Sequence, residues 1–222
     1  GGTLFVEPMS AVNANNGLRE LELKEKKEIE RILAEMSAEA AAHREDINTN
    51  VKILVDLDVI FAKAKLAYHM RAWAPLMNDQ GIVDLRKARH PLLDPKTAVP
   101  ITVRLGTDFD SMIITGPNTG GKTVTLKTIG LLTLMAECGL HVPAGDGSRL
   151  STFDAILADI GDEQSIAQSL STFSSHMRTI VDVVEECDDR TLVLFDELGA
   201  GTDPAEGAAL AIAIIEFCRT MG

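Results

Sequence analysis

The sequence is poor in cysteine and aromatic residues, and it has no long apolar run. Its three cysteines lie far apart among 222 residues, which excludes a disulfide framework and the paired ligand spacing of a zinc site. No apolar run is long enough to cross a bilayer, and the opening residues lack the pattern of a signal peptide. We therefore expect a cytoplasmic protein with no membrane partner.

The formal net charge is −12, and nearly all of it lies in one part of the chain. Residues 144–222 hold fifteen Asp and Glu against four Lys and Arg, which gives this part a net charge of −11. Such an acidic surface repels phosphate backbones, so we expect any nucleic acid to be contacted mostly outside this stretch. The length allows one α/β domain with a helical appendage.

Two segments near the start of the chain predict long helices. Residues 17–46 place apolar residues among many charges, with pairs such as Glu20 and Lys24 at i,i+4 spacing. Residues 48–73 have a broader apolar face and are followed by Pro75, which ends the helical pattern. We interpret the first helix as largely solvated rather than as a nucleic-acid clamp. We expect the second helix to pack antiparallel to it, so that the two form a lever.

The most informative stretch joins a predicted buried strand, Met112–Thr115, to a predicted helix through a glycine-rich loop. The loop has the pattern G-x-x-x-x-G-K-T and comprises Gly116, Pro117, Asn118, Thr119, Gly120, Gly121, Lys122 and Thr123. In a P-loop, inward-pointing backbone N–H groups hold a polyphosphate, the lysine reaches the β- and γ-phosphates, and the threonine hydroxyl binds Mg²⁺. The pattern therefore predicts binding of ATP or GTP. Chance would produce these letters in about one chain in a hundred, so we set aside a mere turn.

A second apolar run, Thr191–Phe195, predicts a buried strand that ends in Asp196 and Glu197. The carboxyl ends of parallel strands meet at one edge of a sheet, where a P-loop also lies. This is the Walker B pattern, in which Asp196 would hold Mg²⁺ and Glu197 would polarise the attacking water as a general base. Two acids that merely end a strand are the alternative, and the P-loop upstream makes us prefer the catalytic interpretation.

Three further features are ambiguous from their residues alone. Ser171 and Thr172 open a predicted helix, where either hydroxyl is a natural N-cap but would also suit a γ-phosphate. On this ground we favour the capping role. Asp159–Ser165 is an acidic segment after a candidate strand at 153–158, and it fits an ordinary loop as well as a functional one. His90 lies next to a proline, and we interpret it as structural.

Together, these motifs resemble those of the MutS family of ABC-type ATPases. The resemblance rests on four segments, Arg89–Leu93, Thr115–Thr123, Ser171–Phe173 and Leu194–Thr202. The segment Asp159–Ser165 and the pair His176 and Met177 are similar to the type II bacterial branch of the family, rather than to its mismatch-recognising branch. The resemblance covers nearly the whole chain.

The resemblance implies an incomplete P-loop NTPase domain of ABC type over residues 76–222, preceded by core and lever helices over residues 1–75. It implies a homodimer in which each ATP lies between the P-loop of one subunit and the serine segment of the other. Ser171 would then face the γ-phosphate in trans, and Asn118 would contact the same region. Proteins of this branch are linked to branched DNA, to suppression of recombination and, in some bacteria, to collided ribosomes. Any endonuclease activity would lie in a missing C-terminal domain.

Two other functions are compatible with the same motifs. A nucleotide-gated binding module would dimerise on ATP with little hydrolysis, but a pure binding switch has no need of a water-polarising carboxylate such as Glu197. A chromosome-maintenance ATPase with coiled-coil arms would need longer helices and sustained heptads, which this sequence lacks. We therefore predict a Mg²⁺-dependent ATPase with Lys122, Asp196 and Glu197 as catalytic residues and with ATP and Mg²⁺ as cofactors.

Overall fold

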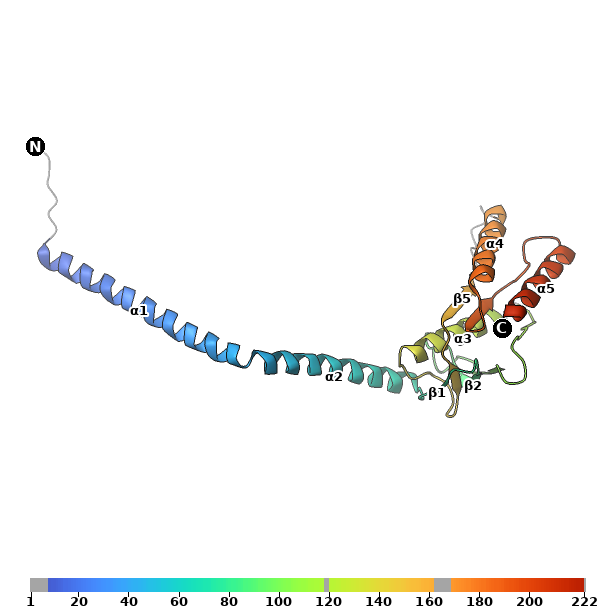
Figure 1. Ribbon diagram of the computed structural model, residues 1–222, viewed down its shortest axis with the longest axis horizontal. Coiled ribbons are helices and arrows are strands. Elements are labelled where there is room, and N and C mark those ends of the chain that lie inside the picture. The colour runs from blue at the N-terminus through green and yellow to red at the C-terminus, as the bar shows by residue number, and fades with distance from the viewer. Residues whose placement is uncertain (1–7, 118–119, 162–168, 222) are drawn as a thin grey trace, which may run out of the picture. The chain divides into compact units, whose positions relative to one another are not determined.

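A computed structural model describes residues 8–117, 120–161 and 169–221, with the backbone alone described for residues 169–175. The chain divides into two compact units, residues 1–60 and residues 61–222. Figure 1 shows the order of the helices and strands along the chain. We describe the two units separately.

The first unit is helical. Helix α1 spans Met9–Ala42, and helix α2, Arg44–Met70, begins in this unit and ends in the second. The expected i,i+4 pair is present, with the Lys24 ammonium 2.8 Å from the Glu20 carboxylate. Both groups are well exposed, so this pair adds little stability. The prediction of a long solvated helix is confirmed.

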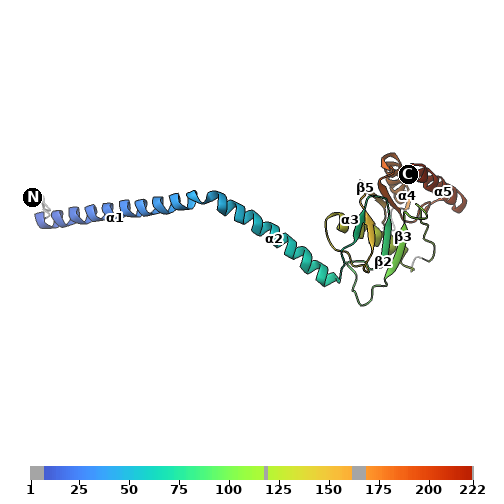
Figure 2. The same cartoon turned by 60° about the horizontal axis from the view of Figure 1, so that its bottom comes forward.

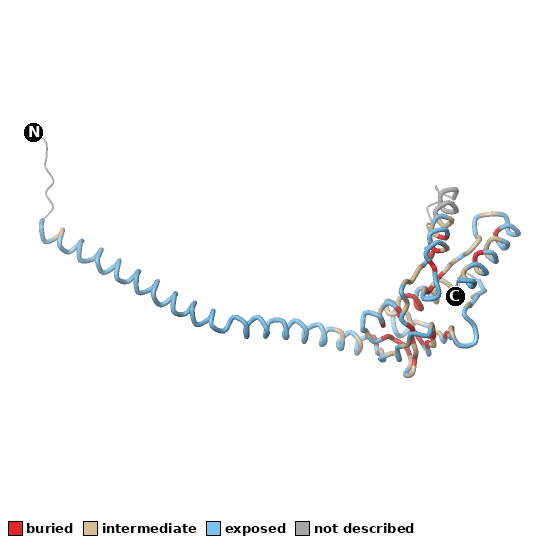
Figure 3. The backbone as a smooth tube through the Cα atoms, in the orientation of Figure 1, coloured by how far each residue is buried: buried red, intermediate tan, exposed pale blue. Residues whose placement is uncertain are grey.

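The predicted antiparallel packing of these two helices is wrong for the described residues. Residues 13–60 are all exposed, and α1 is coloured as exposed along nearly its whole length in Figure 3. An antiparallel pair would bury an apolar stripe on each helix. The physical reason is the connection, because only His43 separates the two helices. Helices that fold back on each other need a connection of about two to eight residues.

The second unit contains a four-stranded sheet. Its strands are β1 (Leu76–Asn78), β2 (Val83–Ala88), β3 (Ile101–Leu105) and β4 (Arg149–Ser151), in the order β1-β4-β2-β3. β2 runs antiparallel to β3 and β4, and Figure 2 shows β2 beside β3. In β2, alternation places Val83 and Leu85 in the core, where both are fully buried.

The second unit also contains a separate pair of parallel strands, and predicted site residues directly follow one of them. β5 spans Ala155–Asp159 and β6 spans Thr191–Phe195, and their register pairs Asp159 with Phe195. The ladder continues one residue further, because the backbone N–H of Asp196 donates to the carbonyl of Asp159 at 2.9 Å. The prediction for β6 is confirmed at both ends. Helix α4, Ser169–Glu186, lies in the chain between these strands, which is the connection that parallel strands require.

Helix α3, Lys122–Glu137, packs its apolar face into the core of this unit. Leu132 is fully buried, and a Cβ added at Gly130 would lie 2.7 Å from Leu194 Cδ1, so the helix approaches β6 closely at this glycine. The helix ends with a glycine in the left-handed conformation, which is a common C-terminal signal. Gly139 has a φ of 69° and its N–H donates to the carbonyl of Ala136 at 2.9 Å.

The predicted buried strand at residues 112–115 is not formed. The structure assigns these residues no strand, and Met112 and Ile113 are 38% and 72% exposed. A strand in the middle of a parallel sheet needs a ladder partner on each side. In the part of the chain that the structure describes, no strand pairs with this run, so its apolar side chains stay in contact with solvent.

Helix α5, Pro204–Met221, begins with proline at its first position, where this residue is common. The carboxylate of Asp203 accepts from the backbone N–H of Ala205 at 2.9 Å, which satisfies one of the free donors of the first turn. Glu206 accepts from the hydroxyl of Thr202 at 3.2 Å. These bonds fix the loop that follows β6 to the start of α5.

Candidate phosphate and magnesium site

The glycine-rich loop leads directly into α3. Gly116 and Gly121 have φ angles of 145° and 79°, which only glycine adopts without strain, and Gly121 is the residue before the helix. The N–H of Gly120 donates to the carbonyl of Pro117 at 2.9 Å. The described residues of the loop therefore turn directly before the N-terminus of α3, where backbone N–H groups and the helix dipole attract anions. Asn118 and Thr119, also predicted to bind nucleotide, lie outside the described residues.

Two side chains at the start of α3 point back toward the loop and toward β6. The ammonium of Lys122 donates to the carbonyl of Gly116 at 2.6 Å, so it lies over the loop that would hold phosphates. The hydroxyl of Thr123 donates to the carboxylate of Asp196 at 2.5 Å. The structure thus brings together the two side chains that the sequence predicts as Mg²⁺ ligands, although 73 positions separate them.

Threonine and aspartate oxygens suit Mg²⁺, which is usually bound by one or two protein groups together with phosphates and water. No group of three or more His, Cys, Asp or Glu side chains gathers as a metal cluster within residues 8–117, 120–161 and 176–221. The pair Thr123 and Asp196 therefore fits a magnesium ion that takes its other ligands from a nucleotide and from water.

Glu197 lies beside this pair in a constrained turn. Its φ is 51°, a left-handed conformation that costs a non-glycine residue on the order of 1 kcal/mol or more. Its carbonyl accepts from the N–H of Ala200 at 2.9 Å, which closes the turn after β6. Gly199 follows with a φ of 83°, and its backbone lies against that of Gly207 in α5. Strain of this kind persists where the surroundings enforce it, which is common at functional sites.

The structure changes the interpretation of Ser171. Helix α4 already includes Ser169, so Ser171 lies within the helix, and the prediction that it caps the helix is wrong. Its side chain is outside what the structure describes. The backbone places it near the N-terminal end of α4, in the chain between β5 and β6.

Sequence reasoning missed a polar contact at the same strand edge. Nδ1 of His176, in α4, lies 2.9 and 3.0 Å from the two carboxylate oxygens of Asp159, the last residue of β5. An ionised carboxylate only accepts hydrogen bonds, so the imidazole N–H donates. The sequence contains one signal for a polar site here, because Asp159 ends an apolar strand and Asp196 directly follows another.

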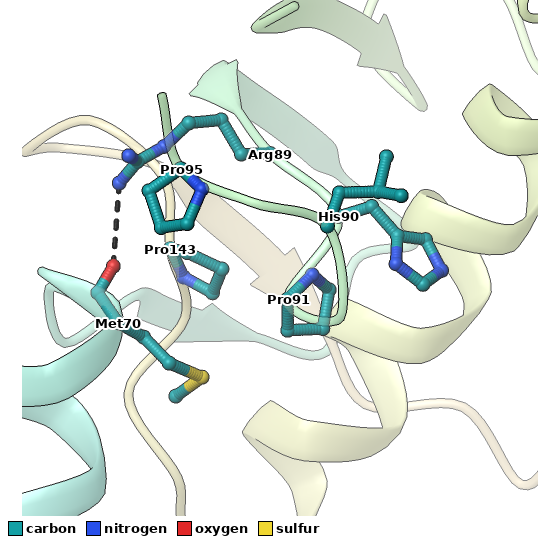
Figure 4. A pocket seen from close by; sticks show the side chains of 7 residues that line it. Met70, Arg89, His90, Pro91, Pro95 and Pro143 are labelled. Carbon is teal, nitrogen blue, oxygen red and sulfur yellow. Dashed lines mark hydrogen bonds between the residues drawn. The ribbon is translucent and has the colours of Figure 1, made fainter. Parts of the chain in front are cut away.

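A small pocket lies near the junction that precedes β3. Figure 4 shows His90 and Pro91 beside Pro95 and Pro143, with Arg89 donating to the carbonyl of Met70 at 3.3 Å. The cavity measures about 10 Å³, which is room for about one water molecule and far too little for a nucleotide base.

His90 has a local structural role in this junction. Burial and the nearby charge of Lys127 lower the pKa of His90, and its Nδ1 accepts from the backbone N–H of Leu92 at 3.3 Å. These contacts agree with the interpretation of His90 as structural.

Comparisons with known proteins agree on one family. The family MutS domain V matches residues 112–221. A protein of Lachnospira eligens named Endonuclease MutS2 is 61% identical over 222 residues. Proteins of the same name from Acetivibrio thermocellus and from Geobacillus sp. (strain WCH70) are 56% and 61% identical over 222 residues. Each comparison covers 100% of this chain and 28% of the relative.

The chain thus spans 28% of the length of these relatives. The structure adds that no helix in the described part of the chain is long and apolar enough to cross a membrane. The matched region contains the glycine-rich loop, α3, the strand pair β5 and β6, and the turn around Glu197. This chain belongs to the MutS family, and proteins named Endonuclease MutS2 match it over its whole length.

Proposed function

We propose that this chain binds and hydrolyses ATP with Mg²⁺, and that it does so as part of a homodimer. The hydrogen bond between Thr123 and Asp196 carries this proposal. It joins the first turn of the P-loop helix to the end of the Walker B strand, and these are the two side chains that a P-loop ATPase needs at its magnesium ion. A structural turn between a strand and a helix would not require this contact.

Each described residue has a specific task in this proposal. The N–H groups at the start of α3 bind the phosphates, and Lys122 exchanges its bond to the Gly116 carbonyl for the β- and γ-phosphates. Thr123 and Asp196 hold the ion. When bound, Mg²⁺ neutralises charge on the phosphates during transfer to water. Glu197 orients and polarises the attacking water, which is the reason we favour hydrolysis over a nucleotide-gated binding module.

The dimer completes the site in this proposal. Ser171 of one subunit faces the γ-phosphate held by the P-loop of the other, so that ATP binding and subunit closure depend on each other. The nucleotide state in turn controls binding of branched DNA, in suppression of recombination, or of stalled ribosomes. The net charge of −11 on residues 144–222 supports contacts to nucleic acid made mostly by other regions.

The first test is nucleotide binding by the full-length natural protein and by two lysine variants. Lys122→Ala removes the phosphate contact, whereas Lys127→Ala removes an exposed lysine one and a half turns further along α3. We expect Lys122→Ala to weaken ATP binding at least tenfold and Lys127→Ala to leave it within about twofold. Equal effects of the two substitutions would contradict the assignment of the P-loop.

The second test is complementation between subunits. Ser171→Ala and Lys122→Ala chains should each be nearly inactive alone. When mixed in equal amounts they should regain on the order of a quarter of the wild-type rate, since half of the dimers are mixed and one of their two sites is intact. A mixture as inactive as its components would refute the shared site.

A further inference from the structure

The hydrogen-bonded pair of Asp159 and His176 lies where the strand pair meets α4. Asp159 is 7% exposed, and its side chain is more deeply buried than that of His176, which is 35% exposed. Both carboxylate oxygens lie within 3.0 Å of Nδ1 of His176. A carboxylate so far removed from water needs a partner, and here the imidazole supplies it.

This pair is directly connected to the magnesium residues. The carbonyl of Asp159 accepts from the N–H of Asp196 at 2.9 Å, and the carboxylate of Asp196 accepts from the hydroxyl of Thr123. A continuous path of hydrogen bonds and backbone therefore leads from the P-loop helix through the ends of β6 and β5 to α4. A polar contact elsewhere on α4 would stabilise the helix without touching this edge of the sheet.

The position of His176 along α4 shows what the pair holds in place. Ile180 and Val183 form the buried stripe of the helix, and His176 continues the same face one turn toward the N-terminus. Apolar packing therefore fixes the later part of α4, whereas the contact between His176 and Asp159 fixes its earlier part. Ser171 lies five residues before His176, or about 7.5 Å along the helix axis.

We infer that Asp159 and His176 are positioning residues that hold the serine-containing start of α4 in register with the strand ends carrying the magnesium site. The inference rests on the proposed function, because Ser171 matters only if it meets a γ-phosphate. Neither Asp159 nor His176 contacts a reacting atom in this proposal. It acts through α4, so its loss should affect the step that needs Ser171 and spare the binding of a nucleotide that has no γ-phosphate.

The test uses matched substitutions of His176 in the full-length natural protein, with ATP turnover, ADP binding and thermal unfolding as readouts. Asparagine places its amide nitrogen near the position of Nδ1 and keeps the donor, whereas glutamine places it near Nε2 and loses the contact. We expect His176→Gln and His176→Ala to lower kcat about ten- to a hundredfold, because small misplacements at an active site have effects of this size. His176→Asn should restore most of the rate, and the Kd for ADP should stay within about twofold in all three variants.

The outcomes separate this inference from the proposed function. If the wild type hydrolyses no ATP, both the proposed function and the positioning role are overturned, because there is then no reaction for the pair to support. An active wild type with an unchanged kcat in His176→Gln would overturn the positioning role alone. Parallel losses of kcat, ADP binding and melting temperature, without rescue by asparagine, would show a merely structural pair and would also overturn it. If His176→Ala fails to fold, the comparison of glutamine with asparagine still decides the matter.

Discussion

Gly207 offers a sharp test of the packing around the Walker B turn. It lies in the first turn of α5, where helix propensity alone predicts that alanine would stabilise the protein by about 1 kcal/mol. The structure predicts the opposite. A Cβ at this position would lie 2.2 Å from the carbonyl oxygen of Gly199 and 3.3 Å from Cγ2 of Thr202.

The close contact at Gly207 is with backbone, so a change of side-chain rotamer cannot relieve it. Overpacking costs about 1–3 kcal/mol, and contact with fixed backbone places this case at the upper end. After subtraction of the propensity gain, Gly207→Ala should lower the free energy of unfolding by about 2 kcal/mol. Gly199 has little freedom to yield, because its φ is 83° and the loop is bonded to α5.

Urea unfolding followed by tryptophan fluorescence measures this effect, since Trp73 is the single tryptophan and its backbone pairs with Val142 in the second unit. Gly17→Ala is the control, because a Cβ there meets no atom within 4 Å. We expect Gly207→Ala to lower the urea midpoint, whereas Gly17→Ala, inside α1, should leave it unchanged or raise it, because alanine favours a helix over glycine. A midpoint for Gly207→Ala at or above that of the parent would refute the predicted clash between α5 and the turn.

Two further predictions concern titratable groups away from the site. Burial and the neighbouring Cys187 raise the pKa of the Cys218 thiol to about 11. Iodoacetamide at pH 8 should therefore label the exposed Cys138 well before Cys218, as followed by mass spectrometry. Labelling of Cys218 before Cys138 would contradict this prediction. The bidentate hydrogen bond from Arg190 lowers the pKa of Asp154. The pair therefore stabilises the folded state above the ordinary aspartate pKa of about 3.9, and this stabilisation is lost as the pH falls through the pKa of Asp154 in the folded protein. Carboxyl NMR should show that Arg190→Gln raises the pKa of Asp154, and an unchanged pKa would contradict this.

Much of the local structure follows from the sequence because its signals are local. The run Thr191–Phe195 is mostly apolar, is bounded by polar residues, and forms β6 with the predicted bounds. Asp203 caps α5 and Gly139 ends α3 as capping rules predict. Each of these depends on a few neighbouring residues, whose conformational preferences the rest of the fold does not override.

The predicted N-cap at Ser171 is a local error, because α4 already includes Ser169, whereas the other two wrong predictions depend on distant parts of the chain. Residues 112–115 have the composition of a buried strand, but a strand forms only when other strands complete its hydrogen bonds. The apolar residues of α1 and α2 indicate a packing partner, but they do not identify it. The antiparallel pair was therefore an inference about a long-range contact, and the one-residue break at His43 rules it out.

The candidate site shows the same division between local and long-range information. Motif spacing identified Lys122, Thr123 and Asp196, and the structure brings the last two into contact. No sequence pattern linked Asp159 to His176, because their contact depends on how α4 returns over the end of β5. Such contacts between elements are the part of a site that a single sequence leaves undetermined.

The most direct test of the proposed function compares ATP hydrolysis and ATP binding in the wild type and in Glu197→Gln. The amide keeps the size of the side chain but cannot act as a base. We predict that Glu197→Gln binds ATP with a Kd within about twofold of the wild type and hydrolyses it at least a hundredfold more slowly. Hydrolysis by Glu197→Gln at the wild-type rate would contradict the assignment of this turn as the catalytic end of an ATPase.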